Sequence, residues 1–516
     1  MTRYVAIFIL FMMSCRMTTA QEKRSLLDSL QYNVELQATL SGGEHTPLWL
    51  NANRYGLSSV RKNNGYLRGA IGRPLYRDSL RRWGVGYGLD VAVASRFTSK
   101  FIVQQAYVEG RWLKGVLTLG SKEYPMELKN QELSSGSQAL GVNARPVPQV
   151  RIALPDYWTI PYTKQWLAIK GHISYGMQTD DGWQKDFTRC ENRYTEHTLY
   201  HSKAGYLRIG PKNITLEIGL EMAAQFGGTS NAVLVGHAPN EKASFKNNQN
   251  LKAFLNAFTS GGSEKSDGMY QNSSGNIFGS WVARLNLDFK DWYLGLYADH
   301  YFEDHSSMFL LDYDGYGSGE EWNQKKQSRY FLYELKDIML GAELHLKRVP
   351  WMDHVVIEYM NTKYQSGPVY HDHTVHNSTH ISGRDNYYNH YLYTGNQHWG
   401  MVMGNPLYLS PVYNEDGWIR VENNRFKAWH LGVSGHPTSR LHYRVLATWQ
   451  RGYGTYDVMY PDPRENVSLL AETAYHFSRG GWQLKAAVGL DSGKLLGDNY
   501  GFQLTVAKTG WIKGKK

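Results

Sequence analysis

The sequence has very few cysteines and no long apolar stretch. Its 516 residues include only Cys15 and Cys190, so a chain that has lost its N-terminus can form no internal disulfide and no cysteine-based metal site. After Ala20 no run approaches the roughly 18 apolar positions that a membrane-spanning helix needs, and the mean hydropathy is −0.50. These absences exclude a disulfide-rich scaffold and argue against a helical protein of the inner membrane.

The N-terminus is typical of an exported protein. Arg3 supplies a positive charge, residues 4–13 form an apolar core, and the small residues ending at Ala20 resemble a cleavage site. We therefore predict that residues 1–20 are a signal peptide. The alternative is a lipoprotein signal in which Cys15 is lipidated, although the residues before it match a lipobox poorly.

Negative charge is less abundant than positive charge, with 46 acidic against 56 basic residues and a net charge of +10. This balance favours acidic partners such as acidic polysaccharide or the phosphates of lipopolysaccharide. Export argues against nucleic acid, and a modest excess over so long a chain is equally compatible with no specific partner. The 37 tyrosines, 17 phenylalanines and 16 tryptophans suit both membrane-interface girdles and sugar-stacking surfaces.

Strict alternation is the main structural signal. From Trp83 to Val93 every odd position is apolar, while the even positions from Gly84 to Ala94 carry glycine, alanine or aspartate. Because side chains on a strand alternate faces, this segment predicts one apolar wall and one small or polar wall. The face of small residues leaves room for bulky groups to pack against it. If the strand belongs to a barrel with this face inward, the pattern favours a filled lumen over an open pore.

Similar segments of about ten residues, with charges on one face only, recur to the C-terminus, as expected of strands that cross a bilayer. A secreted β-sandwich would alternate too, but its strands are usually shorter. We predict an all-β fold, a transmembrane antiparallel β-barrel with short helical insertions and both termini in the periplasm. Its 18 strands are expected near residues 32–40, 65–73, 83–95, 101–112, 115–123, 149–154, 167–177, 203–209, 214–226, 276–289, 291–301, 337–346, 355–365, 426–435, 441–453, 468–477, 481–491 and 500–508.

The connections alternate between short turns and long loops, as in outer-membrane barrels with short periplasmic turns. Residues 21–516 are therefore one barrel, whose long extracellular loops are expected at 227–275, 302–336 and 366–425, with a further long connection at 454–467. Residues 241–258 have apolar positions at helical spacing, which predicts a short helix packed over the barrel mouth. Residues 122–148 are predicted to be irregular, with one helical turn at most.

The loop at 366–425 is the densest candidate for a binding site. Its aromatic residues offer flat faces for sugar rings, and its polar residues offer partners for hydroxyls. The alternative, which is compatible with binding, is that the loop folds into the lumen and plugs it. The candidate ligand-binding residues are Arg384, Asp385, Tyr387, Tyr388, Asn389, His390, Tyr393, Trp399, Asn405, Trp418 and Arg425.

Metal binding and catalysis find little support. The histidines from His371 to His380 could bind a metal, but a loop sequence fixes no geometry, and we assign no metal and no cofactor. No serine has a histidine at a spacing that indicates a triad, so we assign no catalytic residue and expect no enzyme. Lumen carboxylates could act in glycoside hydrolysis, but are expected to pair with basic residues across the lumen. These carboxylates are Glu217, Glu221, Glu343 and Glu358, and the basic residues are Arg284, Arg444 and Lys485.

A series of short motifs in order along the chain resembles the bacterial capsule assembly protein family Wzi. The motifs are Ser274–Trp281, Asn386–His390 with Tyr393, His398–Gly400 with Gly404–Leu407, Asn143–Pro146 and Gly454–Tyr456. The resemblance implies an outer-membrane barrel of about 18 strands with a periplasmic helical part. It also implies a non-enzymatic, lectin-like role in attaching capsular polysaccharide to the cell surface.

Three functions follow from these observations. The leading one is an outer-membrane protein of a Gram-negative bacterium that binds capsular or surface polysaccharide. The others are a porin-like channel for small or charged solutes and a hydrolase of lipid or glycan. Further expected partners are outer-membrane lipid, lipopolysaccharide and the barrel-insertion machinery, since residues 499–506 resemble a C-terminal insertion signal.

Overall fold

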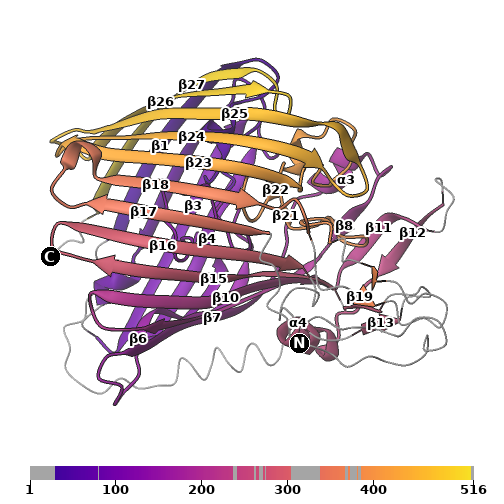
Figure 1. Cartoon of the computed structure of the whole chain (residues 1–516), viewed down its shortest axis with the longest axis horizontal. Coiled ribbons are helices and arrows are strands. Elements are labelled where there is room, and N and C mark those ends of the chain that lie inside the picture. The colour runs from indigo at the N-terminus through magenta and orange to yellow at the C-terminus, as the bar shows by residue number, and fades with distance from the viewer. Residues whose placement is uncertain are drawn as a thin grey trace.

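The computed structural model describes residues 30–78, 81–235, 241–260, 263–265, 271–273, 275–303, 337–365, 370–371, 380–381 and 385–512. The predicted signal peptide and Arg384 lie outside these residues. The main body is one antiparallel sheet of 18 strands, and it closes into a barrel because β1 pairs with both β27 and β2 (Figure 1). The predicted barrel fold is therefore confirmed.

All 18 predicted strands are present, with boundaries that differ by a few residues. The strands of the barrel are β1 (Leu30–Gly42), β2 (Gly65–Arg73), β3 (Trp83–Ser95), β4 (Phe101–Trp112), β5 (Gly115–Ser121), β6 (Gln149–Thr159), β7 (Leu167–Met177), β9 (Leu199–Ile209), β10 (Ile214–Phe226), β15 (Asn276–Asp288), β16 (Trp292–Glu303), β17 (Ile338–Leu346), β18 (His354–Asn361), β23 (Phe426–Thr438), β24 (Leu441–Gly454), β25 (Met459–His476), β26 (Trp482–Gly493) and β27 (Asn499–Ile512).

One boundary prediction is wrong. The expected long connection at 454–467 is a short turn, because β25 already begins at Met459. Pro461 and Pro463 made this segment look irregular, but it pairs only with β24, while pairing with β26 starts at Asn466. Proline lacks an N–H and is tolerated where one edge of a strand has no neighbour.

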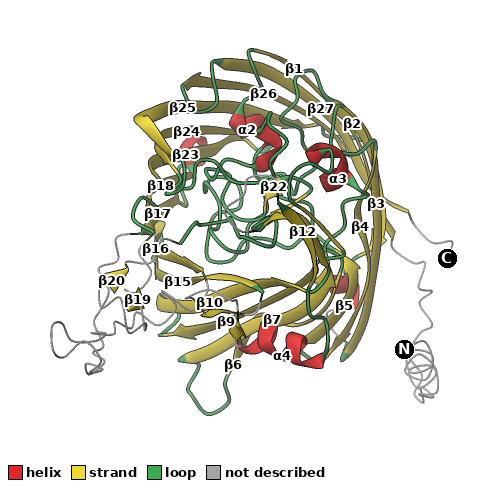
Figure 2. Cartoon of the chain, turned by 90° about the vertical axis from the view of Figure 1, so that its right-hand side faces the viewer, coloured by secondary structure: helices red, strands yellow, loops and turns green. Residues whose placement is uncertain are grey.

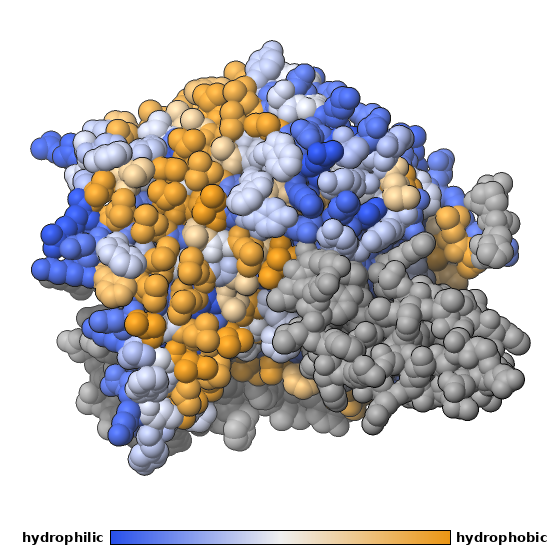
Figure 3. Space-filling view, in the orientation of Figure 1, coloured by the Kyte–Doolittle hydropathy of each residue, from blue (hydrophilic) through white to orange (hydrophobic). Residues whose placement is uncertain are grey.

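The alternation in the sequence places apolar side chains outside the barrel. On β3, Trp83, Leu89 and Val93 are exposed, whereas Gly84 and Ala92 are buried on the lumen side. Equivalent exposed side chains on neighbouring strands form an apolar band across the outer surface, with hydrophilic residues on either side of it (Figure 3). Such a band is the outer surface of a barrel that sits in a bilayer.

Helices contribute little to the fold. None of those in the described part of the chain has both the length and the apolar character needed to span a membrane.

The two ends of the barrel differ. The first and last described residues, Leu30 and Ile512, lie at one end, here called the terminal end, together with most of the short connections; residues 74–82 form the longest connection there. The opposite end, here called the loop end, carries the long connections at 43–64, 122–148, 178–198, 227–275, 304–337 and 362–425. The expected alternation of short turns and long loops holds for most of the barrel, but the loop end also carries short connections at 96–100, 455–458 and 494–498.

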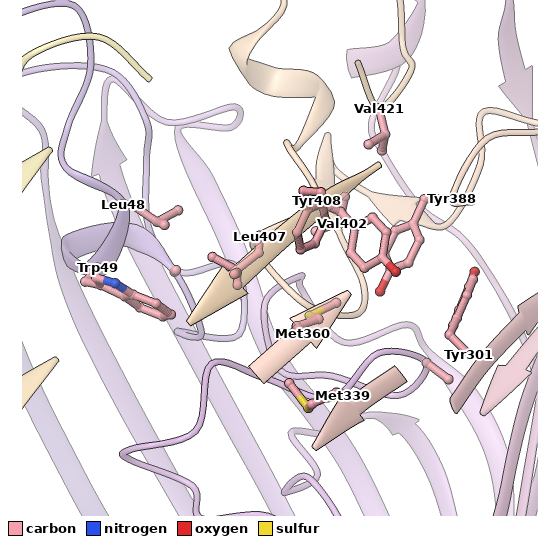
Figure 4. Packing of buried hydrophobic residues seen from close by; sticks show 14 of the residues in the cluster. Leu48, Trp49, Tyr301, Met339, Met360, Tyr388, Val402, Leu407, Tyr408 and Val421 are labelled. Carbon is pink, nitrogen blue, oxygen red and sulfur yellow. The ribbon is translucent and has the colours of Figure 1, made fainter. Parts of the chain in front are cut away.

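Three of the loop-end connections fold back into the lumen and fill much of it (Figure 2). The described residues of these connections, 43–64, 122–148 and 385–425, are here called the plug. A short helix, α2 (Leu48–Asn51), carries Trp49 into a buried cluster with Leu407 and Tyr408 (Figure 4). The filled lumen predicted from the small inner wall of β3 is present, and Leu57 of the plug packs against Ala92 there.

Smaller elements surround the loop end. The predicted helix at 241–258 is half right, because residues 242–246 form a strand and only α4 (Leu251–Thr259) is helical. Met222 and Phe226 lie on the outward face of β10 and pack against Ala253 and Ala257 of α4, so this helix covers the outer wall instead of the mouth. The remaining elements are α3 (Trp183–Thr188), β8 (Tyr194–Glu196), β11 (Thr229–Leu234), β12 (Lys242–Lys246), β13 (Ser263–Lys265), β14 (Gln271–Ser273), β19 (Tyr370–His371), β20 (His380–Ile381), β21 (Gln397–His398), β22 (Met401–Val402), η1 (Leu75–Asp78), η3 (Pro350–Met352) and η4 (Pro411–Tyr413).

At the terminal end, the described residues include only the turns η1 and η3 as helical structure. The helical part that the family resemblance implies for this side is therefore not seen in the described chain. Residues 122–148 are irregular, as expected, apart from one hydrogen-bonded turn at 131–133, where the Ser134 N–H donates to the Asn130 carbonyl at 3.3 Å.

Candidate functional site

Several of the predicted ligand-binding residues form the centre of the plug. Tyr388 and Tyr408 stack with ring centroids 3.9 Å apart, and Tyr387 packs beside them against Tyr301 of β16. The Tyr388 hydroxyl accepts a hydrogen bond from the Asn405 backbone N–H at 3.0 Å and donates one to a backbone carbonyl. These buried side chains hold the plug together and offer no surface to a large ligand.

Asn405 and Asn389 also have structural partners. The Asn405 amide donates to the Gly136 carbonyl at 2.9 Å and so joins the plug segments 122–148 and 385–425. The Asn389 side chain both donates to the Val421 carbonyl and accepts from the Val421 N–H, at 2.9 and 2.8 Å. Each asparagine fixes the path of the backbone.

His390, Tyr393 and Arg425 lie in similar surroundings. The Nδ1 atom of His390 accepts hydrogen bonds from two backbone N–H groups, one of them that of the buried Tyr393. Burial, followed by the charge of Arg193, lowers the pKa of His390 to about 3, so this imidazole is neutral at pH 7. Arg425 lies over the Tyr456 ring at 3.9 Å and donates to a backbone carbonyl. Asp385 is half-buried at the start of the described segment.

Trp399 lies in a different setting, in a small pocket of about 40 Å³ at the loop end. The pocket is also lined by Arg145 of the plug and by Trp183 and Phe187 of α3. Asp180 accepts hydrogen bonds from the N–H groups of Gly182, the N-cap residue of α3, and of Gln184 in its first turn, each at 3.2 Å. Trp183 and Phe187 are four residues apart, so they share one helix face, and their rings stack at 5.0 Å.

Arg145 lies under this pocket with its guanidinium 4.3 Å from the centre of the Trp399 ring. It donates to the Thr98 hydroxyl at 3.0 Å, and no carboxylate of the described residues lies within ion-pair distance. Burial lowers the pKa of Arg145 to about 10, so it remains charged at pH 7. Its backbone carbonyl accepts from Nδ1 of His398, whose Nε2 accepts from the Thr179 N–H.

A second group of arginine and aromatic residues continues the same surface. Arg420 forms ion pairs with Asp416 at 2.8 Å and with a second carboxylate, and it lies 5.3 Å from the Trp418 ring. Arg193 donates to the Tyr391 carbonyl at 2.8 Å. Burial and the neighbouring charge of Arg420 lower the pKa of Arg193 to about 10.

The two groups are in contact, because the Asn192 side chain donates to the Asp416 carbonyl at 3.3 Å next to α3. Together they form one surface at the loop end, here called the arginine–aromatic face. Its members are Arg61, Arg145, Trp183, Phe187, Arg193, Tyr391, Trp399, Trp418 and Arg420. Flat rings beside guanidinium groups suit sugar rings that carry acidic substituents.

Two of the predicted ligand-binding residues, Trp399 and Trp418, thus lie on this face, and the structure brings most of the others together inside the plug. Sequence reasoning missed Trp183 and Phe187. Their spacing of four residues was the available signal. The helix that contains them is too short to give a long periodic pattern in the sequence.

The expected pairing of lumen charges is confirmed for one of the four named carboxylates, Glu343, whereas Glu221 and Glu358 bond to neutral side chains such as Tyr206 and Tyr297. Arg284 pairs with Glu343 at 2.5 Å, and Arg444 and Lys485 both approach Glu472. Glu358 accepts hydrogen bonds from the plug, at 2.6 Å from the Ser134 hydroxyl. In the described part of the chain no three histidine, cysteine or carboxylate side chains group closely enough to hold a metal ion, and the segment from His371 to His380 lies mostly outside that part.

Comparisons with known proteins agree with this architecture. The family model described as capsule assembly protein Wzi matches residues 37–392. The search of curated proteins found no match to the sequence.

Among solved structures, the chain is similar to Wzi, an outer membrane protein involved in group 1 capsule assembly in Escherichia coli and described as a carbohydrate-binding β-barrel. The identity is 12%, the match covers 92% of this chain and 83% of that one, and the TM-score is 0.52. OprD of Pseudomonas aeruginosa, at 9% identity, matches over 94% of this chain and 96% of its own, with a TM-score of 0.43. OccAB4 of Acinetobacter baumannii, at 8% identity, matches over 95% and 100%, with a TM-score of 0.44. At such identities the similarity to Wzi shows the fold, and the lower scores of the other two support no further argument.

Proposed function

Because the chain belongs to the capsule assembly protein Wzi family, we propose that it is an outer-membrane protein that binds capsular or other surface polysaccharide. Binding takes place at the loop end, which faces the cell exterior, and it helps to attach or assemble the capsule. The apolar outer band and the position of the first and last described residues, Leu30 and Ile512, at the short-turn end support this orientation. Lipid and lipopolysaccharide surround the band, and the role is one of binding without catalysis.

The observation that carries the proposal is the arginine–aromatic face. Tyr391 is exposed and Trp399 and Trp418 are half-buried, so three rings of the 385–425 segment are accessible, and the half-buried Phe187 of α3 lies beside Trp399. Aromatic rings stack on the apolar faces of sugars. Guanidinium groups such as that of the exposed Arg61 add charge-assisted hydrogen bonds to carboxylate or phosphate groups.

The plug weighs against the porin-like alternative. Its segments are bonded to one another and to the wall, as where the Leu48 N–H donates to Asp491 of β26 at 3.0 Å and the Trp49 indole donates to Thr448 of β24 at 3.1 Å. A lumen with these contacts supports only a small ionic current. Bilayer conductance of the purified protein measures this directly, and a large stable current would favour the channel.

The proposal is tested with the double substitution Tyr391→Ala and Trp418→Ala. Each lost stacking contact costs about 0.5–1.5 kcal/mol, so the affinity for purified surface polysaccharide should fall by about tenfold. The matched control is Tyr162→Ala, which removes a fully exposed tyrosine from a turn at the terminal end. Binding is measured on immobilised full-length protein, with the melting temperature as a check of folding. Equal losses in the double variant and in the control would contradict the proposal.

A further inference from the structure

A cavity of about 470 Å³ lies inside the barrel, between the plug and the wall formed by β4 to β7 and β9. It is here called the inner cavity. Its volume is in the range of sites for small ligands. Tyr76 of η1 contributes to the lining, so the cavity extends to a turn at the terminal end, away from the arginine–aromatic face. Arg145 lines both the inner cavity and the small pocket of that face.

The carboxylates of the inner cavity already have cationic partners. Glu109 pairs with Lys122 at 2.5 Å. Glu123 pairs with Arg68 of β2 at 3.4 Å, and Glu127 pairs with Lys170 of β7. Each negative charge in the lining is therefore balanced within the protein.

Two guanidinium groups in the lining have no such partner. Neither Arg145 nor Arg151 has a carboxylate within ion-pair distance among the described residues. Arg151 lies instead over the ring of Tyr124 at 3.7 Å, and the Nε atoms of both arginines are buried without a hydrogen-bond partner in the described chain. Unbalanced positive charge in an enclosed site attracts an anion more strongly than it would in open water.

The rest of the lining suits a ring-shaped polar ligand. Tyr107, Tyr124, Tyr200 and Tyr206 contribute aromatic surface, and Ser202 contributes a hydroxyl. Tyrosine combines a flat apolar face with a hydroxyl that donates and accepts hydrogen bonds. A purely inorganic anion would use the arginines and leave these rings without contacts.

We propose that the inner cavity is a second binding site, distinct from the arginine–aromatic face, and that it takes a carboxylated sugar of one or two rings. Arg151 holds the carboxylate, and the tyrosines pack against the sugar ring, while Arg145 adds positive charge where the cavity approaches the arginine–aromatic face. The site is reached from the terminal end, so a glycan bound there contacts the protein from the side opposite to the proposed capsule-binding surface. The inference does not depend on binding at that surface.

The test is titration calorimetry on the full-length protein in detergent, with a disaccharide that contains glucuronic acid and with its glucose counterpart. The wild-type protein should bind the acidic disaccharide at least about tenfold more tightly than the neutral one. Arg151→Gln should weaken binding of the acidic disaccharide by about tenfold and leave the neutral one nearly unchanged. Ala153→Phe, which fills space in the same cavity wall, should remove binding of both.

Two controls separate this site from others. Arg479→Gln removes an exposed arginine from a terminal-end turn and should bind like the wild type. The double variant Tyr391→Ala and Trp418→Ala should also keep binding of the acidic disaccharide, because it alters only the arginine–aromatic face. The proposal is overturned if Arg151→Gln and Ala153→Phe bind like the wild type while melting normally. It is also overturned if equimolar sulfate displaces the disaccharide completely, since the rings would then contribute nothing.

Discussion

The two halves of the barrel wall meet the plug in different ways. The half formed by β15 to β18 and β23 to β26 bonds directly to the plug, through pairs such as Lys129 with Asp299 and Arg54 with Glu472. The half formed by β4 to β7 and β9 borders the inner cavity, and its ion pairs with the plug, Glu109 with Lys122 and Lys170 with Glu127, lie around that cavity and stay partly exposed. The first half holds the plug in place, and the second leaves the inner cavity between itself and the plug.

The comparison shows how one sheet can serve two purposes. The half that includes β15 to β18 and β23 to β26, here called the packed half, buries Phe278, Met339 and Phe426 against the plug. The half that includes β4 to β7 and β9, here called the cavity half, places tyrosines and arginines towards open space. Burial of apolar side chains stabilises the position of the plug. Substitutions in the packed half should therefore cost stability, and those in the cavity half should mainly change binding.

The largest contrast is expected between two tyrosines. Tyr388→Ala removes a fully buried ring from the centre of the plug and should cost about 3–5 kcal/mol of unfolding free energy. It should also raise the bilayer conductance, because the plug loosens. Tyr124→Ala, at the inner cavity, should cost clearly less, since its ring is only partly buried. Urea unfolding in detergent measures both, and equal costs would remove the distinction between the halves.

Two lysines provide a test of the charged contacts. Lys129 and Asp299 are almost completely buried and lie 2.6 Å apart, so Lys129→Met leaves an unpaired buried charge that costs about 3–5 kcal/mol. Lys122 is partly exposed and, like Glu109, lines the inner cavity, so Lys122→Met leaves its carboxylate partner beside open space and should cost clearly less than Lys129→Met. Adding Asp299→Asn to Lys129→Met should recover part of the loss. No recovery would show that the pair acts through packing alone.

Substitutions that add volume should also change stability differently in the two halves, but the difference should be smaller than for the substitutions above. Ala487 of β26 is buried against the plug, so Ala487→Phe should destabilise the protein by about 1–3 kcal/mol through overpacking. Ala153 of β6 faces the inner cavity, so Ala153→Phe should change stability by less than about 1 kcal/mol. Thermal unfolding of the two variants side by side is sufficient, and a reversed order would contradict the assigned cavity.

Acid should weaken the plug gradually. Burial lowers the pKa of His398 to about 4, and the ring is held neutral between the Arg145 carbonyl and the Thr179 N–H. An unfolded histidine titrates near pH 6.5, so between about pH 6.5 and 4 the unfolded chain binds more protons and stability falls as the pH falls. Proteolysis of residues 385–425 should accelerate from pH 7 to pH 5. His398→Asn should be less stable at pH 7 but less sensitive to pH, while His476→Gln, at an exposed position, should behave like the wild type.

Much of the fold could be predicted from the sequence because each strand carries its own signal. Alternation such as that of residues 83–94 depends only on local order, and it correctly assigned apolar residues to the outside and small residues to the lumen. The start of β25 was missed because Pro461 and Pro463 normally end strands, and only the pairing pattern shows that one edge there is free.

The candidate site was less predictable because its contacts join distant parts of the chain. The Asn143 side chain bonds to the Val402 carbonyl, and His398 bonds to the Arg145 carbonyl, so neither partner indicates the other in sequence. The aromatic content of 366–425 pointed to the right region, but it could not separate buried residues such as Tyr388 from half-buried ones such as Trp418. Which loops fold inward is decided by packing across the lumen.

The most direct test of the proposed function is amide hydrogen exchange of the purified protein with and without bound surface polysaccharide. We expect slower exchange in peptides that cover residues 178–198 and 411–421, which carry α3 and Trp418, and no change in the terminal-end turn at 160–166. Protection confined to the terminal-end turns, with none at the arginine–aromatic face, would contradict polysaccharide binding at the loop end.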